Sequence, residues 1–156
     1  MRIALGADHA AAAFKQELLT YVRSLGHTAV DYGVPLGATA SDYPVSAEIT
    51  ARAVASGDCD LGLVCCGTGQ GVMLAANKVR GIRCAVCTDC YSAAMARQHN
   101  DANMLALGAR VLGIELAKLL VSTFLSTPFE GGRHAVRVGM ITDIERRESA
   151  GEVTGA

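Results

Sequence analysis

Residues 60–79, DLGLVCCGTGQGVMLAANKV, determine how the rest of the chain is organised. The segment Leu61–Cys66 is a nearly continuous apolar run, as expected for a parallel strand that is buried on both faces. Three glycines at alternate positions follow it, and a helix-forming segment then reaches about Asn77. This order predicts a strand, a tight backbone turn and a helix, with the turn at the carboxyl end of the strand.

The remainder of the chain alternates between strand-like and helix-like segments. Further strands are expected at Arg2–Ala7, 28–32, 82–87 and Met104–Gly108. Further helices are expected at about 10–25, 44–56, 91–99, 113–126 and 133–147. This alternation predicts an α/β three-layer sandwich, in which a Rossmann-like, mainly parallel sheet of five strands carries helices on both faces. We expect a single domain over residues 1–148 and a flexible tail over 149–156.

The composition is that of a globular protein with a complete core. Of the 156 residues, 51% are hydrophobic and 19% are charged, and the formal net charge is −1. Such a charge gives no reason to expect nucleic acid or a membrane as a partner. No apolar run approaches the roughly 20 residues of a membrane-spanning helix. The first residues lack the features of a secretory signal peptide, so we expect a cytoplasmic location.

Six cysteines raise the question of metal binding or disulfide formation. The run CAVCTDC, residues 84–90, resembles iron–sulfur spacing but lacks the fourth cysteine and the proline of that motif, so we expect no metal. Without an export signal, buried thiols account for most of the cysteines better than disulfides do. Cys65 and Cys66 must face opposite sides of their strand. We therefore expect Cys65 in the core and Cys66 at the rim of a site, near the positive end of a helix.

The glycine loop has the features of an anion-binding turn. Gly67, Gly69 and Gly71 allow the backbone to approach a ligand and to turn its amides toward an oxyanion or a phosphate. The loop is not a P-loop, because no Gly-Lys-Ser/Thr follows it. It is closer to the dinucleotide fingerprint, and Asp89 has the expected spacing, but Val72 replaces the third glycine. Nucleotide binding and a tight turn without a ligand stay open as alternatives.

Two histidines occupy ends of predicted elements. His9 follows Asp8 directly after the first strand, where the pair could cap the next helix or contact a sugar. His99 ends the fourth predicted helix, a position that favours a cationic imidazole even without a ligand. Both a structural and a chemical role are therefore open for these side chains.

Three arginines are candidates for anion binding. Arg133 and Arg137 are four residues apart on the last predicted helix and share a face, with His134 nearby. Arg110 follows the fifth predicted strand. The arginines of the last helix could bind a phosphate, and they could equally form a solvated basic face.

Several motifs, in their order along the chain, resemble the B-type ribose-5-phosphate isomerases, a family related to the isomerases of allose and galactose 6-phosphates. These motifs are ADHAAAAFK, SDYP, CCGTGQGVMLAANKV, GIRCAVC, YSAAMARQHNDANMLALGARV, ELAKLLVSTFL and FEGGRH. The resemblance extends over about residues 2–147. It implies an enzyme of the pentose phosphate pathway that interconverts ribose 5-phosphate and ribulose 5-phosphate without a metal or an organic cofactor. It also implies homodimers, sometimes paired into tetramers, with each active site shared between two subunits.

The resemblance also implies a role for each candidate residue. Cys66 would be the base that moves a proton between C2 and C1, with Thr68 and the loop amides binding the oxygen of a cis-enediolate. His99 would help to open the furanose ring. The implied contacts to the sugar and its enediolate are Asp8, Tyr43, Gly67, Gly69, Gly71 and Asn100. The implied contacts to the phosphate are His9, Arg110, Arg133 and Arg137.

One position separates two branches of this family. Some members carry a glutamate directly after the last loop glycine and use it as the base. Val72 stands there in this chain, which leaves Cys66 as the base. A six-carbon aldose 6-phosphate, such as allose 6-phosphate, stays open as the substrate. A nucleotide-binding regulatory module and a thiol-transfer protein are the alternatives from other classes, and neither explains the arginines.

Overall fold

The computed structural model describes residues 1–151 of the chain. In this part, five parallel strands form one sheet with the order β2-β1-β3-β5-β4. The strands are β1 (Arg2–Ala7), β2 (Thr28–Asp31), β3 (Leu61–Cys66), β4 (Cys84–Val86) and β5 (Met104–Gly108). The helices are the 3-10 turn η1 (His9–Ala11), α1 (Ala12–Ser24), α2 (Tyr43–Ala55), α3 (Gln70–Ala76), α4 (Cys90–Gln98), α5 (Ile114–Ser126) and α6 (Arg133–Ala150).

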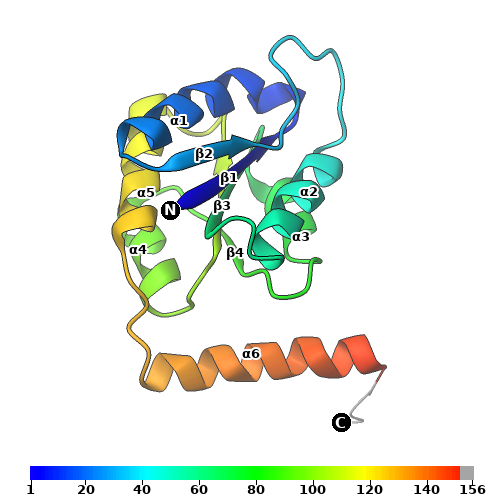
Figure 1. Ribbon diagram of the computed structural model, residues 1–156, viewed down its shortest axis with the longest axis vertical. Coiled ribbons are helices and arrows are strands. Elements are labelled where there is room, and N and C mark those ends of the chain that lie inside the picture. Colours follow the sequence, from blue (N-terminus) through cyan, green and yellow to red (C-terminus); the bar gives the residue numbers. More distant parts are fainter. Residues whose placement is uncertain (152–156) are drawn as a thin grey trace.

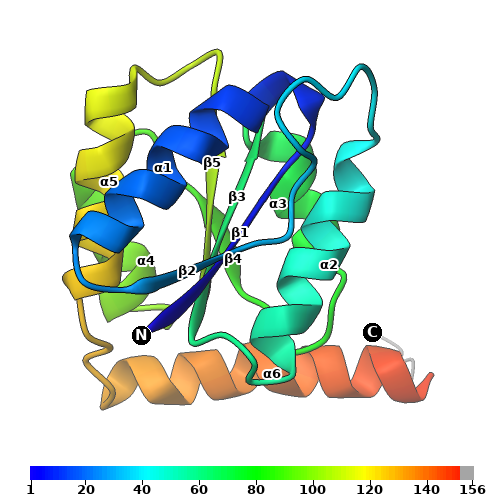
Figure 2. The ribbon, with the colours of Figure 1, turned by 45° about the horizontal axis from the view of Figure 1, so that its top comes forward.

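Helices cover both faces of the sheet, so the predicted three-layer sandwich is confirmed (Figures 1 and 2). One cluster of buried side chains joins the sheet to α1, α4 and α5, and a second joins it to α2 and α3. The central strands β3 and β5 are buried along their whole length because they have a strand on each side and helices above and below. Cys65 belongs to the first cluster and Cys66 to the second, so the predicted opposite orientation of the two thiols is confirmed.

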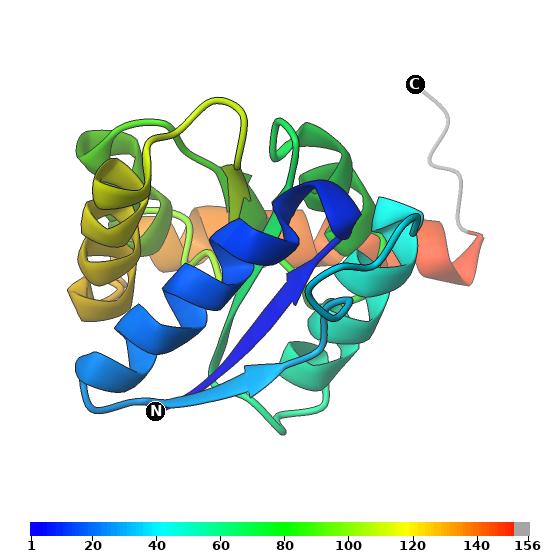
Figure 3. The same ribbon diagram turned by 90° about the horizontal axis from the view of Figure 1, so that it is seen from above.

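The carboxyl ends of the central strands meet at one edge of the sheet. In the parallel register, Ala7 pairs with Cys65, and Cys66 pairs with Gly108. The connection from β1 leads outward to β2, whereas the connection from β3 leads past β5 to β4 on the other side. The connections therefore diverge between the ends of β1 and β3, which is where ligands bind in sheets of this kind. Figure 3 shows the molecule from above.

Helix α6 lies apart from both helical layers, across the opposite edge of the sheet (Figures 1 and 2). Its residue Glu145 holds it to the domain, because the carboxylate oxygens accept hydrogen bonds from the Gly81 amide at 3.0 and 3.1 Å. Four of its large apolar side chains are exposed: Val136, Met140, Ile141 and Ile144. A single copy of the chain therefore leaves an apolar surface of α6 uncovered. Among residues 1–151, no helix is both long enough and apolar enough to cross a membrane.

Several boundaries differ from the sequence expectation for local reasons. The first helix begins as the turn η1 because the Asp8 side chain accepts a hydrogen bond from the Ala11 amide at 3.2 Å. Strand β4 is shorter than expected, and the side-chain amide of Asn77 bonds both backbone groups of Cys84 at this sheet edge. Helix α6 continues to Ala150, three residues beyond the expected end at 147. The rest of the expected tail, residues 152–156, lies outside the described residues.

We predict that Phe124→Ala lowers the free energy of unfolding by about 3–5 kcal/mol. Phe124 lies on α5 with its side chain fully buried against the sheet, so its loss leaves a cavity. The matched control is Leu36→Ala, since Leu36 is 69% exposed, and we expect a change within about 0.5 kcal/mol. Urea denaturation measures both. Equal effects of the two substitutions would show that the core does not extend beneath α5.

Candidate active site

The glycine loop directly follows Cys66 and hydrogen-bonds its sulfur. Cys66 is the last residue of β3, and its Sγ accepts a hydrogen bond from the Gly69 amide at 3.2 Å. Gly69 has a φ of +80° and directly precedes α3, so a residue with a side chain would be strained there. The loop thus places a thiol and backbone N–H groups at one point, which favours negative charge on the sulfur or on a nearby oxygen.

Two other glycines of the loop allow larger side chains to lie against it. A methyl group on Gly71 would lie 2.6 Å from Cε2 of Tyr43, so the ring of Tyr43 packs directly on the loop. A methyl group on Gly67 would lie 3.5 Å from the guanidinium of Arg110, whose own amide donates to the Gly67 carbonyl at 2.9 Å. The loop is therefore flanked by an aromatic ring and by a cation.

The end of β1 contributes Asp8 and His9. Asp8 is buried and caps η1, so its expected capping role is confirmed, while its contact to a sugar stays a prediction. The side chain of His9 is exposed, and its Nδ1 accepts a hydrogen bond from the Ser41 amide at 3.2 Å. Ser41 Oγ also accepts from the His9 amide at 3.2 Å. These bonds fix His9 against the segment that leads into α2.

A buried lysine holds this segment in place. Lys15 on α1 is 2% exposed, and its Nζ donates to the Asp31 carboxylate and to the Val34 carbonyl. The buried charge is thus paired and hydrogen-bonded, as such a group must be. Lys15 therefore ties the start of the loop between β2 and α2 to the first helix.

The structure brings one group of predicted residues together at the carboxyl edge of the sheet. The members of this carboxyl-edge group are Asp8, His9, Tyr43, Cys66, Gly67, Thr68, Gly69, Gly71 and Arg110. They come from the ends of β1, β3 and β5 and from the start of α2. The alignment of parallel strand ends is the physical reason why residues so distant in sequence become neighbours.

A second group of predicted residues lies at the opposite, amino edge. The members of this amino-edge group are His99, Asn100, Arg133 and Arg137. His99 follows α4, which returns the chain to the start of β5, where Met104 pairs with Gly62. Gly62 and Cys66 are four residues apart on β3, a separation of about 13 Å at about 3.3 Å per residue. Within one chain, the amino-edge group therefore does not reach Cys66.

The amino-edge group has the chemistry of an anion site. Arg133 and Arg137 are exposed in the first turns of α6, where the helix dipole adds positive charge. The ring of His99 stacks on His134, with centroids 4.1 Å apart and planes 2° from parallel. His134 was noted in the sequence only as a neighbour of the arginines, because nothing in the local pattern indicates that its ring meets a histidine from another helix.

The same histidines and Glu130 do not fit a metal centre. Possible ligand atoms of His99, Glu130 and His134 lie within 4.8 Å of one another. However, the nearly parallel rings direct their nitrogen lone pairs along parallel planes, whereas a bound metal needs them to converge. Arg133 Nε also donates to His134 Nε2 at 3.4 Å, which uses the nitrogen that faces Glu130.

The sequence profile of the family described as Ribose/Galactose Isomerase matches residues 3–141. The chain belongs to this family. It is 46% identical over 148 residues to the Escherichia coli K12 protein named Ribose-5-phosphate isomerase B, covering 95% of this chain and 99% of the relative. It is 43% identical to D-erythrulose-4-phosphate isomerase of Pectobacterium atrosepticum, covering 95% and 97% of the two chains. The structure of Clostridium thermocellum Ribose-5-Phosphate Isomerase B superimposes with a TM-score of 0.92 at 49% identity, over 95% of this chain and 99% of the other. The resemblance found in the sequence is confirmed.

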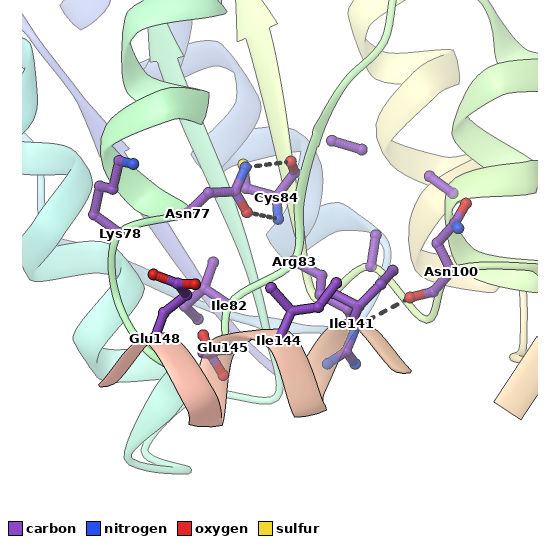
Figure 4. Close-up of a pocket in the computed structure, with 13 residues that line it drawn as sticks. Asn77, Lys78, Ile82, Arg83, Cys84, Asn100, Ile141, Ile144, Glu145 and Glu148 are labelled. Atoms are coloured by element: carbon purple, nitrogen blue, oxygen red, sulfur yellow. Dashed lines mark hydrogen bonds between the residues drawn. The ribbon is translucent and has the colours of Figure 1, made fainter. Parts of the chain in front are cut away.

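In this isomerase, a hollow of about 610 Å³ lies between α6 and the rest of the domain, away from the Cys66 loop (Figure 4). Ile141 and Ile144 of α6 face Ile82 and Arg83 across it. Asn100 is the predicted site residue that lines this hollow. Its backbone carbonyl accepts a hydrogen bond from Arg83 Nε at 3.0 Å. The apolar side chains on both walls suit a hydrophobic contact better than a sugar phosphate.

Three other thiols of the isomerase, those of Cys65, Cys84 and Cys87, are poorly suited to chemistry. All six cysteines lie within the described residues and are free thiols. Burial raises the pKa of Cys65 far above its ordinary value, raises that of Cys84 to about 12 and raises that of Cys87 to about 11. These three side chains are therefore protonated at neutral pH, as the expectation of buried core thiols requires.

We predict that iodoacetamide at pH 8 modifies Cys66 at least about tenfold faster than Cys65 or Cys84, because alkylation requires a thiolate and burial raises the pKa of the Cys65 and Cys84 thiols far above pH 8. Peptide mapping by mass spectrometry measures the ratio. Protein in denaturant is the control, since all six thiols should then react at similar rates. Equal labelling of Cys65 and Cys66 in the native state would contradict the assignment of Cys65 to the core.

Proposed function

We propose that this chain is an aldose–ketose isomerase that interconverts ribose 5-phosphate and ribulose 5-phosphate. The observation that carries the proposal is the Cys66 thiol that accepts a hydrogen bond from the Gly69 amide of a glycine loop at the carboxyl edge of the sheet. The substrate is supported by the relatives from Escherichia coli and Clostridium thermocellum, which carry the name ribose-5-phosphate isomerase B at 46% and 49% identity. Neither a nucleotide-binding module nor a thiol-transfer protein needs these groups together.

Cys66 acts as the base of the reaction. Its thiolate takes the proton from C2 of the open-chain aldose, and the electrons of that bond form the double bond of a cis-enediolate. The resulting thiol returns the proton to C1 while the hydroxyl proton on O2 is transferred to O1, which leaves a ketone at C2, an alcohol at C1 and no net oxidation. Val72 supports this assignment, because it occupies the position of the alternative glutamate base and is fully buried in the core.

The loop stabilises the charge that develops on the enediolate oxygen. The Gly69 amide already donates to the sulfur, and the exposed hydroxyl of Thr68 accepts a hydrogen bond from the Gln70 amide at 3.4 Å, so the turn orients these groups before the substrate binds. Asp8 and Tyr43 contact the sugar from the neighbouring elements. His9 and Arg110 lie beside the loop as contacts for the phosphate, which anchors the reacting carbons in place.

The remaining functions come from a second copy of the chain. His99, which opens the furanose ring, and Asn100, Arg133 and Arg137, which bind the substrate, lie at the edge of the sheet opposite to Cys66. A homodimer that places the amino-edge group of one protomer against the carboxyl-edge group of its partner completes each site. The exposed apolar side chains of α6 and the hollow beside it support such a contact. Pairing into tetramers and a cytoplasmic location stay predictions from the sequence.

A second candidate substrate differs from ribose 5-phosphate in its number of sugar carbons. The Pectobacterium atrosepticum relative is named D-erythrulose-4-phosphate isomerase, and its 43% identity is close to that of the ribose-5-phosphate isomerase relatives. A four-carbon ketose phosphate is therefore a specific alternative, beside the six-carbon allose 6-phosphate expected from the sequence. All three substrates would use the same base and the same phosphate contacts.

The proposed function is tested by following ketose or aldose formation from ribose 5-phosphate, erythrulose 4-phosphate and allose 6-phosphate. We expect ribose 5-phosphate to give the highest kcat/KM. Cys66→Ala should lower kcat by about 10²–10⁴-fold, because the base is lost. Cys65→Ala is the matched control and should retain turnover, since its thiol faces the other side of the sheet. Near-normal turnover by Cys66→Ala would overturn Cys66 as the base, and activity on another sugar alone would change the substrate.

The shared site is tested by mixing two variants that each have strongly reduced turnover of ribose 5-phosphate, Cys66→Ala and His99→Asn. In a mixed dimer, one of the two sites combines an intact Cys66 from one protomer with an intact His99 from its partner. Random association should therefore restore about a quarter of the wild-type activity. Each variant refolded alone is the control. No recovery, although mixed dimers are detected by native mass spectrometry, would place His99 and Cys66 in the same protomer's site.

A further inference from the structure

Two histidines from different helices lie face to face at the amino edge of the sheet. His99 directly follows α4 and His134 is the second residue of α6, and their rings are nearly parallel at a centroid distance of 4.1 Å. In the proposed reaction, His99 exchanges a proton with the sugar, but no step is assigned to His134. The stack therefore needs a separate explanation.

We propose that His134 is a positioning residue for ring opening, which holds the imidazole of His99 at the angle from which it meets the sugar. This inference rests on the proposed function and on the role of His99 in it. It adds a residue that touches neither the substrate nor the reacting atoms.

The stack is the contact that orients the ring of His99. Within residues 1–151, the His99 ring makes no hydrogen bond, and its backbone amide donates to the Met95 carbonyl at 2.9 Å. The ring is only partly buried, so the surrounding core does not enclose it on all sides. A parallel ring at van der Waals distance restricts that rotation without using either nitrogen of His99. Both nitrogens stay available for proton exchange.

His134 is itself held firmly enough to serve as a support. It is 6% exposed, and its backbone amide donates to the Gly131 carbonyl at 3.0 Å. The Glu130 amide donates to the Gln98 carbonyl at 3.1 Å, which fixes the segment before α6 to the end of α4. Arg133 Nε donates to His134 Nε2 at 3.4 Å. The segment that carries His134 is thus bonded to the end of α4, and the ring itself accepts one hydrogen bond from its neighbour on α6.

The charges around the stack suit a change of protonation at His99. Burial lowers the pKa of His134, and His99, Arg133 and Arg137 lower it further, against an opposing effect of Glu130. His134 is therefore neutral at neutral pH. When His99 gains a proton, it faces the π-surface of a neutral ring, a favourable arrangement for a cation, and not a second positive charge.

The test compares a flat and a non-flat replacement of similar size, His134→Phe and His134→Leu, on two substrates. Ribose 5-phosphate is a furanose that must open, whereas ribulose 5-phosphate has no ring to open because its C5 oxygen carries the phosphate. We expect His134→Leu to lower kcat on ribose 5-phosphate by about tenfold or more and to leave the initial rate on ribulose 5-phosphate within about threefold. His134→Phe should stay within about threefold on both substrates, because the flat ring remains.

A second readout shows whether His134 acts through His99. In a His99→Asn background, adding His134→Leu should cause no further loss on ribose 5-phosphate, because the group being positioned is already absent. Three outcomes would overturn the proposal: equal losses of His134→Leu on both substrates, losses of His134→Phe as large as those of His134→Leu, or additive effects in the double variant. If His134→Leu does not fold, as judged by thermal melting, His134→Asn takes its place in each comparison.

The single variant His99→Asn distinguishes a failure of the positioning role of His134 from a failure of the proposed function. If the wild-type protein does not convert ribose 5-phosphate, the proposed function fails. If it does, but His99→Asn keeps full turnover of ribose 5-phosphate, the ring-opening role of His99 fails, and the positioning role of His134 fails with it. If His99→Asn loses turnover as expected and His134→Leu does not, only the positioning role is overturned.

Discussion

The parallel register of the sheet is the constraint on which the rest of this structure depends. Because every strand runs the same way, the carboxyl end of each strand lies at the carboxyl edge of the sheet. Each helix must then bring the chain back to the amino edge. Residues at or just after the ends of strands, such as Cys66 and Arg110, therefore lie at the carboxyl edge. Residues that follow helices, such as His99, gather at the amino edge. The division of the candidate residues into two groups is a direct result of this topology.

The division also explains why α6 has such an unusual place. A helix packed on either face of the sheet would lie in one of the two helical layers, but α6 runs across the amino edge, held there by Glu145 and by the stack of His134 on His99. Its start is basic and its middle carries exposed apolar side chains. It is built as an element that connects one protomer to another surface, and it adds little to the core of its own chain.

Much of this arrangement could be predicted from the sequence. The continuous apolar runs of β3 and β5 gave their boundaries correctly, because fully buried parallel strands have no polar alternation to blur the pattern. The alternation of side chains along a strand was sufficient to predict that Cys65 and Cys66 face opposite sides of the sheet. The start of β4 could not be predicted, since it depends on the side chain of Asn77, which bonds the first residue of the strand from another element.

The positions of the histidines were harder to predict for a similar reason. Residue type and helix position indicate that His99 and Arg133 suit anion chemistry, but not at which edge they lie relative to Cys66. That requires the direction of α4 with respect to the sheet. The stack of His134 on His99 depends on the turn at Gly131 and Gly132, both with positive φ, which sets the start of α6 against the end of α4. No periodicity in a single sequence reports the meeting of two helix ends.

The location of Arg133 and Arg137 on α6 has a consequence for how the enzyme assembles. In the proposed dimer, a phosphate bound between Arg133 and Arg137 of one protomer and the His9 and Arg110 side chains of the other touches both chains at once. A ligand that binds the dimer and not the separate protomers draws the association equilibrium toward the dimer by mass action. The sugar phosphate would then act as a reversible cross-link, and the stability of the assembly would rise and fall with the supply of its own substrate.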